Sequence, residues 1–181
     1  MVLALGAVLG ILVGMALGGS LSRPADLKLR GLPLFGLAVG LQLVAYPPVL
    51  QPPDRVATAM WLASYGVIVL VAAVNRRVRG FPLATLGMLS NLAAVTSNGG
   101  HMPALRSAMA DAGVDFGVRA NSELASSPNL PWLIDRWGAP WWVPMANVYS
   151  IGDVLLALGA VVIVAAGMGA RLPRLPRRQP A

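Results

Sequence analysis

Residues 147–170 read NVYSIGDVLLALGAVVIVAAGMGA, an apolar run with a single charged side chain, Asp153. A carboxylate inside hydrocarbon costs about 3 kcal/mol on insertion scales, so it usually marks a function or a well-satisfied structural role. Ser150 precedes Asp153 by three residues, a spacing typical of a capping box that would begin the helix near Ile151. Alternatively, the helix begins at Asn147, and Asp153 then lies deeper and needs a polar partner.

Four earlier apolar runs have similar lengths, at residues 2–21, 32–50, 56–74 and 81–97. Hydrophobic residues make up 56% of the 181-residue chain and charged residues 12%, about half the charged fraction of soluble domains. A spanning helix needs about 20 predominantly apolar residues. The sequence therefore predicts an all-α integral membrane protein with five transmembrane helices.

The basic residues alternate between the connections of these five runs. Ten of the 14 fall on one side, and the positive-inside rule assigns that side to the cytoplasm: Arg23, Lys28, Arg30, Arg76, Arg77, Arg79, Arg171, Arg174, Arg177 and Arg178. This predicts an N-terminus outside, a cytoplasmic C-terminus with a basic tail at 171–181, and a place in a bacterial inner membrane. The net charge of +7 then reflects helix orientation, and nucleic acid is not an expected partner.

Glycines recur every four residues in the first run, at Gly6, Gly10, Gly14 and Gly18. This spacing places them on one helix face, where they let a second backbone approach closely. Gly36 and Gly40 in the second run form a shorter groove of the same kind, so we expect the first two helices to pack together. A contact with a second copy or another membrane protein would use the same face, beside the lipid bilayer.

A polar stripe follows the fourth run, where Gly87, Asn91, Ala94 and Asn98 share one helical face. Such a stripe should face protein or water rather than lipid. It ends in the tight-turn sequence Asn98-Gly99-Gly100-His101-Met102-Pro103.

Residues 98–146 form a long outer loop, and loops of this length are often functional. We expect a short interfacial helix at about 104–112. Four tryptophans crowd its second half, at Trp132, Trp137, Trp141 and Trp142. They indicate either an aromatic belt at the outer headgroup level or an aromatic-lined site for a lipid-like ligand.

Three features together resemble a family of uncharacterised bacterial multi-pass membrane proteins: Asn91, the Asn98-Gly99-Gly100-x-Met102-Pro103 turn, and Ser150-Ile151-Gly152-Asp153. The resemblance covers nearly the whole chain. It implies a five-helix membrane protein of domain-of-unknown-function type without an assigned reaction, and it identifies no catalytic residues.

The segment from Asn147 to Asp153 is also similar to the Asn-x-Ala-Asp motif at the outer end of the last helix in lipoprotein signal peptidases. The spacing differs, and the second motif of those enzymes, Gly-Asn-x-x-Asp-Arg, has no counterpart. An aspartyl peptidase needs two carboxylates that share a proton. A partner for Asp153 would have to come from Asp111, Asp115, Glu123 or Asp135.

Other chemistries find little support in the composition. Cysteine is absent and His101 is the only histidine, which excludes thiolate and bis-histidine sites within one chain. We therefore expect no cofactor and no metal. The interpretation we favour is a small accessory or ligand-binding subunit rather than an enzyme, whose outer Trp-rich loop binds a lipid-like ligand or another membrane protein.

Two alternatives remain open: a proton- or cation-coupled transporter that uses Asp153, and a membrane-embedded aspartyl hydrolase with Asp153 as a catalytic residue. The candidate binding residues are Asn91, Asn98, Gly99, Gly100, His101, Trp141, Trp142, Ser150 and Asp153.

Overall fold

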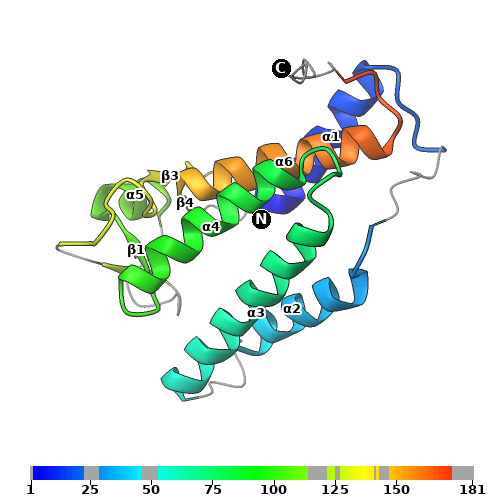
Figure 1. Cartoon of the computed structure of the whole chain (residues 1–181). Coiled ribbons are helices and arrows are strands. Elements are labelled where there is room, and N and C mark those ends of the chain that lie inside the picture. Colours follow the sequence, from blue (N-terminus) through cyan, green and yellow to red (C-terminus); the bar gives the residue numbers. More distant parts are fainter. Residues whose placement is uncertain are drawn as a thin grey trace, which may run out of the picture.

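The computed structural model describes residues 2–22, 29–45, 53–113, 122–124, 127–140, 142 and 147–172, and is mostly helical (Figure 1). Its longer helices are α1 (Val2–Ala16), α2 (Leu32–Ala45), α3 (Asp54–Val74), α4 (Phe81–Ser97) and α6 (Ile151–Gly167). The segment between α4 and α6 contains β1 (Met102–Ala104), α5 (Arg106–Asp111), β2 (Ser122–Leu124), β3 (Trp137–Gly138) and β4 (Val148–Tyr149).

Several boundaries differ from the sequence-based expectation. The first helix ends at Ala16, because Gly18 adopts a left-handed φ of 78°. The last begins at Ile151, as the capping-box interpretation predicts, and not at Asn147. Residues 46–50 and 173–181, parts of the second run and the basic tail, lie outside the described residues.

The outer segment, which we expected to be a loop with one short helix, also contains short strands. Met102–Ala104 is extended and pairs in parallel with Ser122–Leu124, so the short helix begins at Arg106 instead of residue 104. Trp137–Gly138 pairs antiparallel with Val148–Tyr149. Pro103 within β1 has no amide hydrogen to extend a helix, which favours the extended strand there.

The helix α6 lies between α1 and α4 and contacts both. On one side Gly6, Gly10 and Gly14 of α1 are buried, and a methyl group at Gly6 would lie 2.7 Å from the carbonyl oxygen of Ala157. Gly10 meets Val161 and Gly14 meets Met168 in the same order, so the two helices run parallel.

The expected pairing of the α1 glycines with α2 is therefore wrong. Methyl groups placed at Gly36 and Gly40 would meet no atom within 4 Å, and the same holds for Gly18 beyond the end of α1. The physical reason is that α6 presents small residues, including Ala157, to the α1 glycines, which allows the two backbones to approach closely.

On its other side α6 packs against α4 through glycines. Gly80 and Gly87 at the α4 side are seven residues apart, and so are Gly152 and Gly159 of α6. A methyl group at Gly87 would overlap the carbonyl oxygen of Gly152. A methyl group at Gly159 would lie 2.6 Å from the amide nitrogen of Ala84, and one at Gly80 would lie 2.5 Å from the carbonyl oxygen of Gly159. The layer α1–α6–α4 is thus held at close backbone contact.

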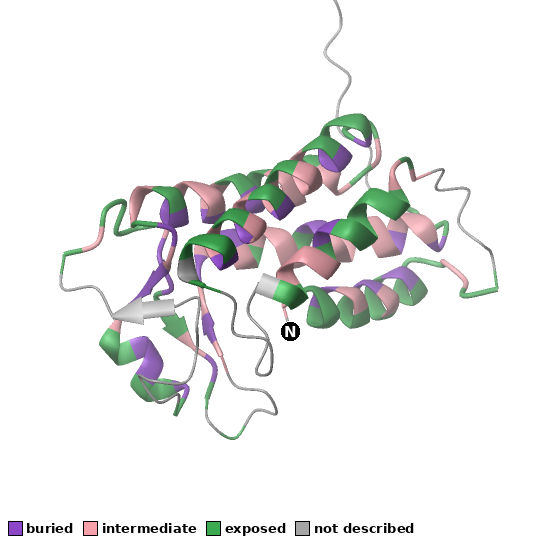
Figure 2. Cartoon of the chain, turned by 90° about the horizontal axis from the view of Figure 1, so that it is seen from below, coloured by how far each residue is buried: buried purple, intermediate pink, exposed green. Residues whose placement is uncertain are grey.

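The helices α2 and α3 form a second layer, in which α2 packs on α3 (Figures 1 and 2). Asn75, at the C-terminal end of α3, holds the start of this layer. Its side-chain amide donates to the Arg30 carbonyl over 2.8 Å, and its Oδ1 atom accepts from the Arg30 amide over 2.9 Å. These two hydrogen bonds therefore join the segment before the N-terminus of α2 to the C-terminal end of α3.

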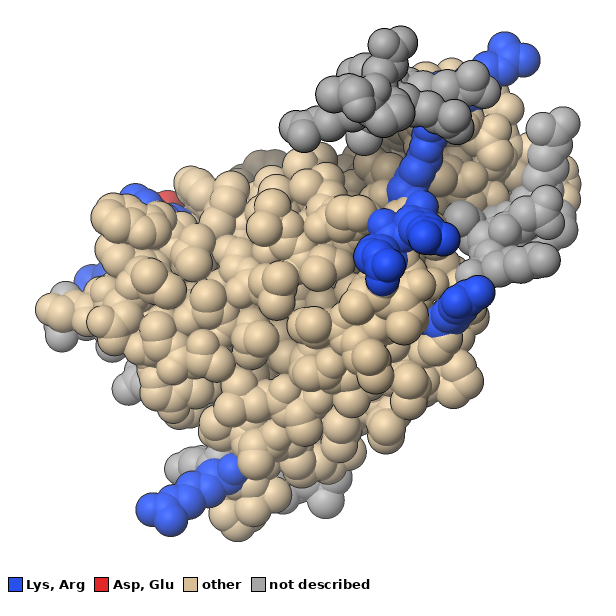
Figure 3. All heavy atoms as spheres, in the orientation of Figure 1, with Lys and Arg blue, Asp and Glu red and all other residues tan. Residues whose placement is uncertain are grey.

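The surface of the bundle is largely apolar. Figure 3 shows one face almost free of charged side chains, with basic residues gathered near its two ends. Among the described residues, only Arg55–Val74 has both the length and the hydropathy of a membrane span. The apolar helices Val2–Ala16, Leu32–Val44, Phe81–Ser97 and Ile151–Gly167 are shorter.

Candidate functional site

A capping box begins α6. The Asp153 amide donates to the Ser150 hydroxyl oxygen over 3.1 Å, and the Ser150 amide donates to a carboxylate oxygen of Asp153, also over 3.1 Å. Both groups satisfy amides that a helix N-terminus otherwise leaves free. The carboxylate also lies where the helix dipole favours negative charge.

Asn91 of α4 joins this cap to the neighbouring helix. Its side-chain NH₂ group donates to the other carboxylate oxygen of Asp153 over 2.9 Å, and its side-chain oxygen Oδ1 accepts from the Ser150 hydroxyl over 2.7 Å. Gly152 makes this approach feasible, because a methyl group there would overlap the Asn91 carbonyl oxygen. Asn91 and Ser150 are both buried.

Asp135 reaches the same region from the outer segment. Its backbone amide donates to the Pro103 carbonyl over 3.0 Å, and its carbonyl accepts from the Leu105 amide over 2.9 Å. The Arg136 amide donates to the Tyr149 carbonyl over 2.9 Å, directly before the cap of α6. Asp135 is therefore held between the segment that follows α4 and the segment that precedes α6. It is only 5% exposed.

The two carboxylates line one polar cavity of about 370 Å³ at this end of the bundle. Among the described residues, its lining contains no Lys, Arg or His side chain. It consists of Val2, Leu3, Gln42, Trp61, Tyr65, Asn91, Val95, Met102, Asp135, Asn147, Val148, Asp153 and Leu156. The predicted capping box is therefore confirmed and a helix start at Asn147 is wrong, but Asp153 also has the polar partner Asn91 and lines a cavity.

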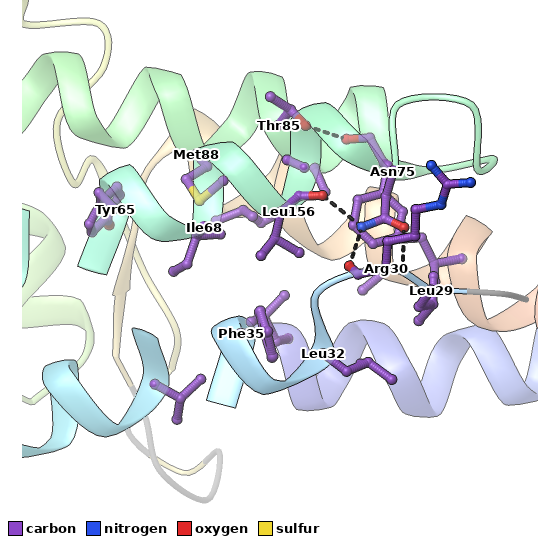
Figure 4. A pocket seen from close by; sticks show the side chains of 18 of the residues that line it. Leu29, Arg30, Leu32, Phe35, Tyr65, Ile68, Asn75, Thr85, Met88 and Leu156 are labelled. Carbon is purple, nitrogen blue, oxygen red and sulfur yellow. Dashed lines mark hydrogen bonds between the residues drawn. The ribbon is translucent and has the colours of Figure 1, made fainter. Parts of the chain in front are cut away.

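A second cavity, of about 320 Å³, lies between the two helix layers and is almost entirely apolar. Figure 4 shows Tyr65 near one end of it and Asn75 with Arg30 near the other, with Ile68, Met88 and Leu156 between them. Along α3, Tyr65 and Asn75 are ten positions apart, which corresponds to about 15 Å of helix rise. The cavity is therefore long enough to accommodate an alkyl chain.

The polar and apolar cavities share four lining residues, Leu3, Gln42, Tyr65 and Leu156. Tyr65 stacks on Trp61 with ring centroids 4.2 Å apart and the planes tilted by 45°. The two cavities are therefore neighbours, one polar with two carboxylates in its lining and one apolar that extends toward the arginine-bearing end.

Other predicted site residues lie outside these cavities. Asn98 caps α4 and holds the outer segment, since its Oδ1 accepts from the Asn129 amide over 2.8 Å and its amide donates to the Asn129 carbonyl over 3.0 Å. Gly99 and Gly100 form the tight turn, with φ values of 72° and 93°. His101 follows this turn and lines neither cavity.

The loop tryptophans also lie away from the cavities. Trp132, Trp137 and Trp142 are 66%, 50% and 69% exposed and line neither cavity, and Trp141 lies outside the described residues. The tryptophan that does line the polar cavity is Trp61 of α3. Sequence reasoning did not select it, because an aromatic residue inside an apolar run carries no local signal.

Of the four carboxylates offered as partners for Asp153, the structure brings Asp135 into its cavity. Asp111 is exposed at the end of α5, the side chain of Glu123 is not described, and Asp115 lies outside the described residues. The described residues contain no group of three or more His, Cys, Asp or Glu side chains that could hold a metal ion.

The fold defines a small helical-bundle protein in which a polar and an apolar cavity are neighbours. The chain belongs to DUF5317, a family of unknown function whose model matches residues 26–165. This agrees with the resemblance to an uncharacterised family. No curated protein and no solved structure matches the chain significantly.

Proposed function

We propose that the protein is an integral protein of the bacterial cytoplasmic membrane, with α1, α2, α3, α4 and α6 as spanning segments. The strongest support comes from α1, whose residues are all apolar and, apart from the three buried glycines, at least partly exposed. Water would not favour such a surface, whereas lipid tails would cover it. The shorter helices, of 14 to 17 residues, rise about 21–26 Å and need a slightly thinned bilayer.

The orientation we propose has the N-terminus outside and the arginine-bearing end in the cytoplasm. The Arg79 side chain donates to the Leu172 carbonyl over 3.4 Å, and the Arg171 amide donates to the Leu17 carbonyl over 3.1 Å. These contacts gather the C-terminal ends of α1, α3 and α6 at the same end of the bundle, in agreement with the positive-inside rule.

Single cysteines test this orientation, because the chain has none of its own. Trp142→Cys should react with an impermeant thiol reagent on intact cells, since residue 142 is exposed in the outer segment. Arg77→Cys should react only after the membrane is permeabilised. The reverse pattern would overturn the orientation, and equal labelling of both sites in intact cells would contradict the spanning arrangement.

Within this membrane protein, we propose that the two neighbouring cavities together bind a single amphiphile, as part of a ligand-binding or accessory subunit. The observation that carries the proposal is the shared lining of a polar and an apolar chamber. A lipid-like molecule would place its polar head between Asn91, Asp135 and Asp153 and its tail along Ile68 and Met88. Ligand sites of this kind are mostly apolar, with a few converging polar groups.

A polarity-sensitive dye with an alkyl tail provides the test, with the full-length protein in a neutral detergent. Ile68→Trp should fill the apolar chamber and abolish the saturable fluorescence increase. Leu70→Trp is the matched control, because Leu70 lies on the same helix, is 54% exposed and lines neither cavity. Equal dye binding by both variants would contradict the proposal.

A membrane-embedded aspartyl hydrolase is the second candidate, favoured by the presence of Asp135 and Asp153 in one cavity. Against it, both carboxylate oxygens of Asp153 already accept hydrogen bonds from Asn91 and Ser150. A hydrolase should cleave a fluorogenic lipidated peptide only while both carboxylates are present. Turnover that persists in Asp135→Asn or Asp153→Asn would exclude this mechanism.

A further inference from the structure

Two polar side chains at the boundary of the cavities have no hydrogen-bond partner in the part of the chain that the structure describes. They are the Gln42 carboxamide of α2 and the Tyr65 hydroxyl of α3, and both residues line the polar and the apolar cavity. In the polar cavity, by contrast, the Asn91 and Asp153 side chains hydrogen-bond each other. Gln42 and Tyr65 therefore offer hydrogen bonds that no described protein group takes up.

The depth of Tyr65 makes a missing partner costly. Tyr65 lies eleven positions after Asp54, the first residue of α3, and nine positions before Val74, the last. It is therefore about 14 Å of helix rise from the nearer end. In the spanning arrangement proposed above, this is near the middle of the membrane, where a hydroxyl group without a partner costs free energy. A ligand in the cavities can supply that partner.

From these two groups we infer that the bound amphiphile carries a secondary amide between its polar head and its alkyl tail, an inference that rests on the amphiphile-binding function proposed above. The Tyr65 hydroxyl and the Gln42 NH₂ group donate hydrogen bonds, and the Gln42 side-chain oxygen accepts them. An amide linkage offers a carbonyl oxygen to these donors and an N–H to this acceptor. An ester has no N–H, so it would leave the Gln42 oxygen without a donor.

The position of Tyr65 suits a linkage between head and tail. Figure 4 shows Tyr65 near one end of the apolar cavity, with Ile68 and Met88 further along it. Its ring stacks on Trp61, with ring centroids 4.2 Å apart. A ring that is held before the ligand arrives loses little conformational entropy on binding, so more of the hydrogen-bond energy contributes to affinity.

The test compares three probes with the same alkyl tail and the same hydroxyethyl head as competitors of the bound dye. They are the ethanolamide of dodecanoic acid, the ethylene glycol monoester of dodecanoic acid and ethylene glycol monododecyl ether. The amide should displace the dye at a concentration about fivefold lower than the ester, as expected for one additional neutral hydrogen bond. The ether should be the weakest competitor. Equal potency of the amide and the ester, or a stronger effect of the ether, would overturn the inference.

Two variants assign the preference to its residues. Gln42→Met keeps an unbranched, flexible side chain and should abolish the preference for the amide over the ester. Tyr65→Phe keeps the ring that stacks on Trp61 and should lower the potency of the amide and the ester toward that of the ether. Thr85→Val is the matched control, because Thr85 lines the apolar cavity but its hydroxyl already donates to the Phe81 carbonyl over 2.7 Å.

The ratio of potencies within each variant is the quantity to compare, because it cancels differences in how the probes partition into detergent. An amide-to-ester ratio that is unchanged in Gln42→Met, or that falls equally in Thr85→Val, would contradict the assigned site. If the wild-type protein binds neither the dye nor any of the three probes, the amphiphile-binding function fails as well. Dye binding with equal potency of the three probes contradicts the amide linkage alone, so the two failures are distinguishable.

Discussion

The two helix layers differ in how closely their helices pack. In the layer α1–α6–α4, glycines bring backbones into contact, and Asn91 adds hydrogen bonds to Ser150 and Asp153. In the layer α2–α3, Gly36 and Gly40 face open space, and an apolar cavity separates this layer from the first. The comparison indicates that close backbone contacts and cross-helix hydrogen bonds hold the first layer together, whereas the second layer leaves an apolar cavity between itself and the first.

Breaking the close layer should have the largest effect. Gly152→Ala places a methyl group on the Asn91 carbonyl oxygen and 2.6 Å from the carbonyl oxygen of Gly87. Overpacking of this kind costs about 3 kcal/mol, so the melting temperature of the purified protein should fall strongly. An unchanged melting temperature would mean that α4 and α6 are not in close contact.

Asn91→Ala should have the next largest effect. It removes the acceptor of the Ser150 hydroxyl proton and one donor to the Asp153 carboxylate, while the cap within α6 remains. A buried polar group left without its partner costs about 2 kcal/mol. Thr96→Ala on the same helix is the control, because Thr96 is exposed and its hydroxyl donates only to α4 carbonyls. Equal melting temperatures for the two variants would show that Asn91 does not join the helices.

Ser150→Ala should cost about 1–2 kcal/mol, because it removes the N-cap and also the hydroxyl that donates to the Asn91 side-chain oxygen. The Asp153 amide then loses its acceptor, and the start of α6 should exchange its amide hydrogens faster. Hydrogen exchange measured by mass spectrometry would localise this effect to the N-terminal end of α6. An increase confined to other segments would contradict the cap.

Gly36→Ala should have the smallest effect and the opposite sign. The added methyl group meets nothing within 4 Å, and alanine favours the helix by about 0.5 kcal/mol. A clear loss of stability would show that α2 lies against another helix or a second copy of the chain, as the glycine spacing alone suggests.

The helical runs and the cap of α6 could be predicted from the sequence because both are local. Apolar length marks the helices, and Ser150-x-x-Asp153 satisfies backbone amides within one turn. The partner of α1 could not be predicted, because glycine spacing shows which face packs closely but not against which helix. The pairs Gly80 with Gly87 and Gly152 with Gly159 were a usable signal, since their equal spacing matches in the α4–α6 contact.

The candidate site was predictable in part. Asn91, Ser150 and Asp153 were selected because polar residues in apolar runs are costly, and all three meet in the structure. Asp135 could only be one of four candidates, since its placement depends on the pairing of Trp137–Gly138 with Val148–Tyr149. Such short pairings have little sequence signature, and Tyr65 and Trp61 are likewise recognised only from the fold.

The central claim is that the space between the two layers holds an amphiphile, and native mass spectrometry of the gently purified protein tests it most directly. The account predicts a wild-type species heavier than the bare chain by the mass of one small amphiphile, and an Ile68→Trp species without that added mass. A wild-type protein that carries no ligand, or an added mass that persists unchanged in Ile68→Trp, would contradict it.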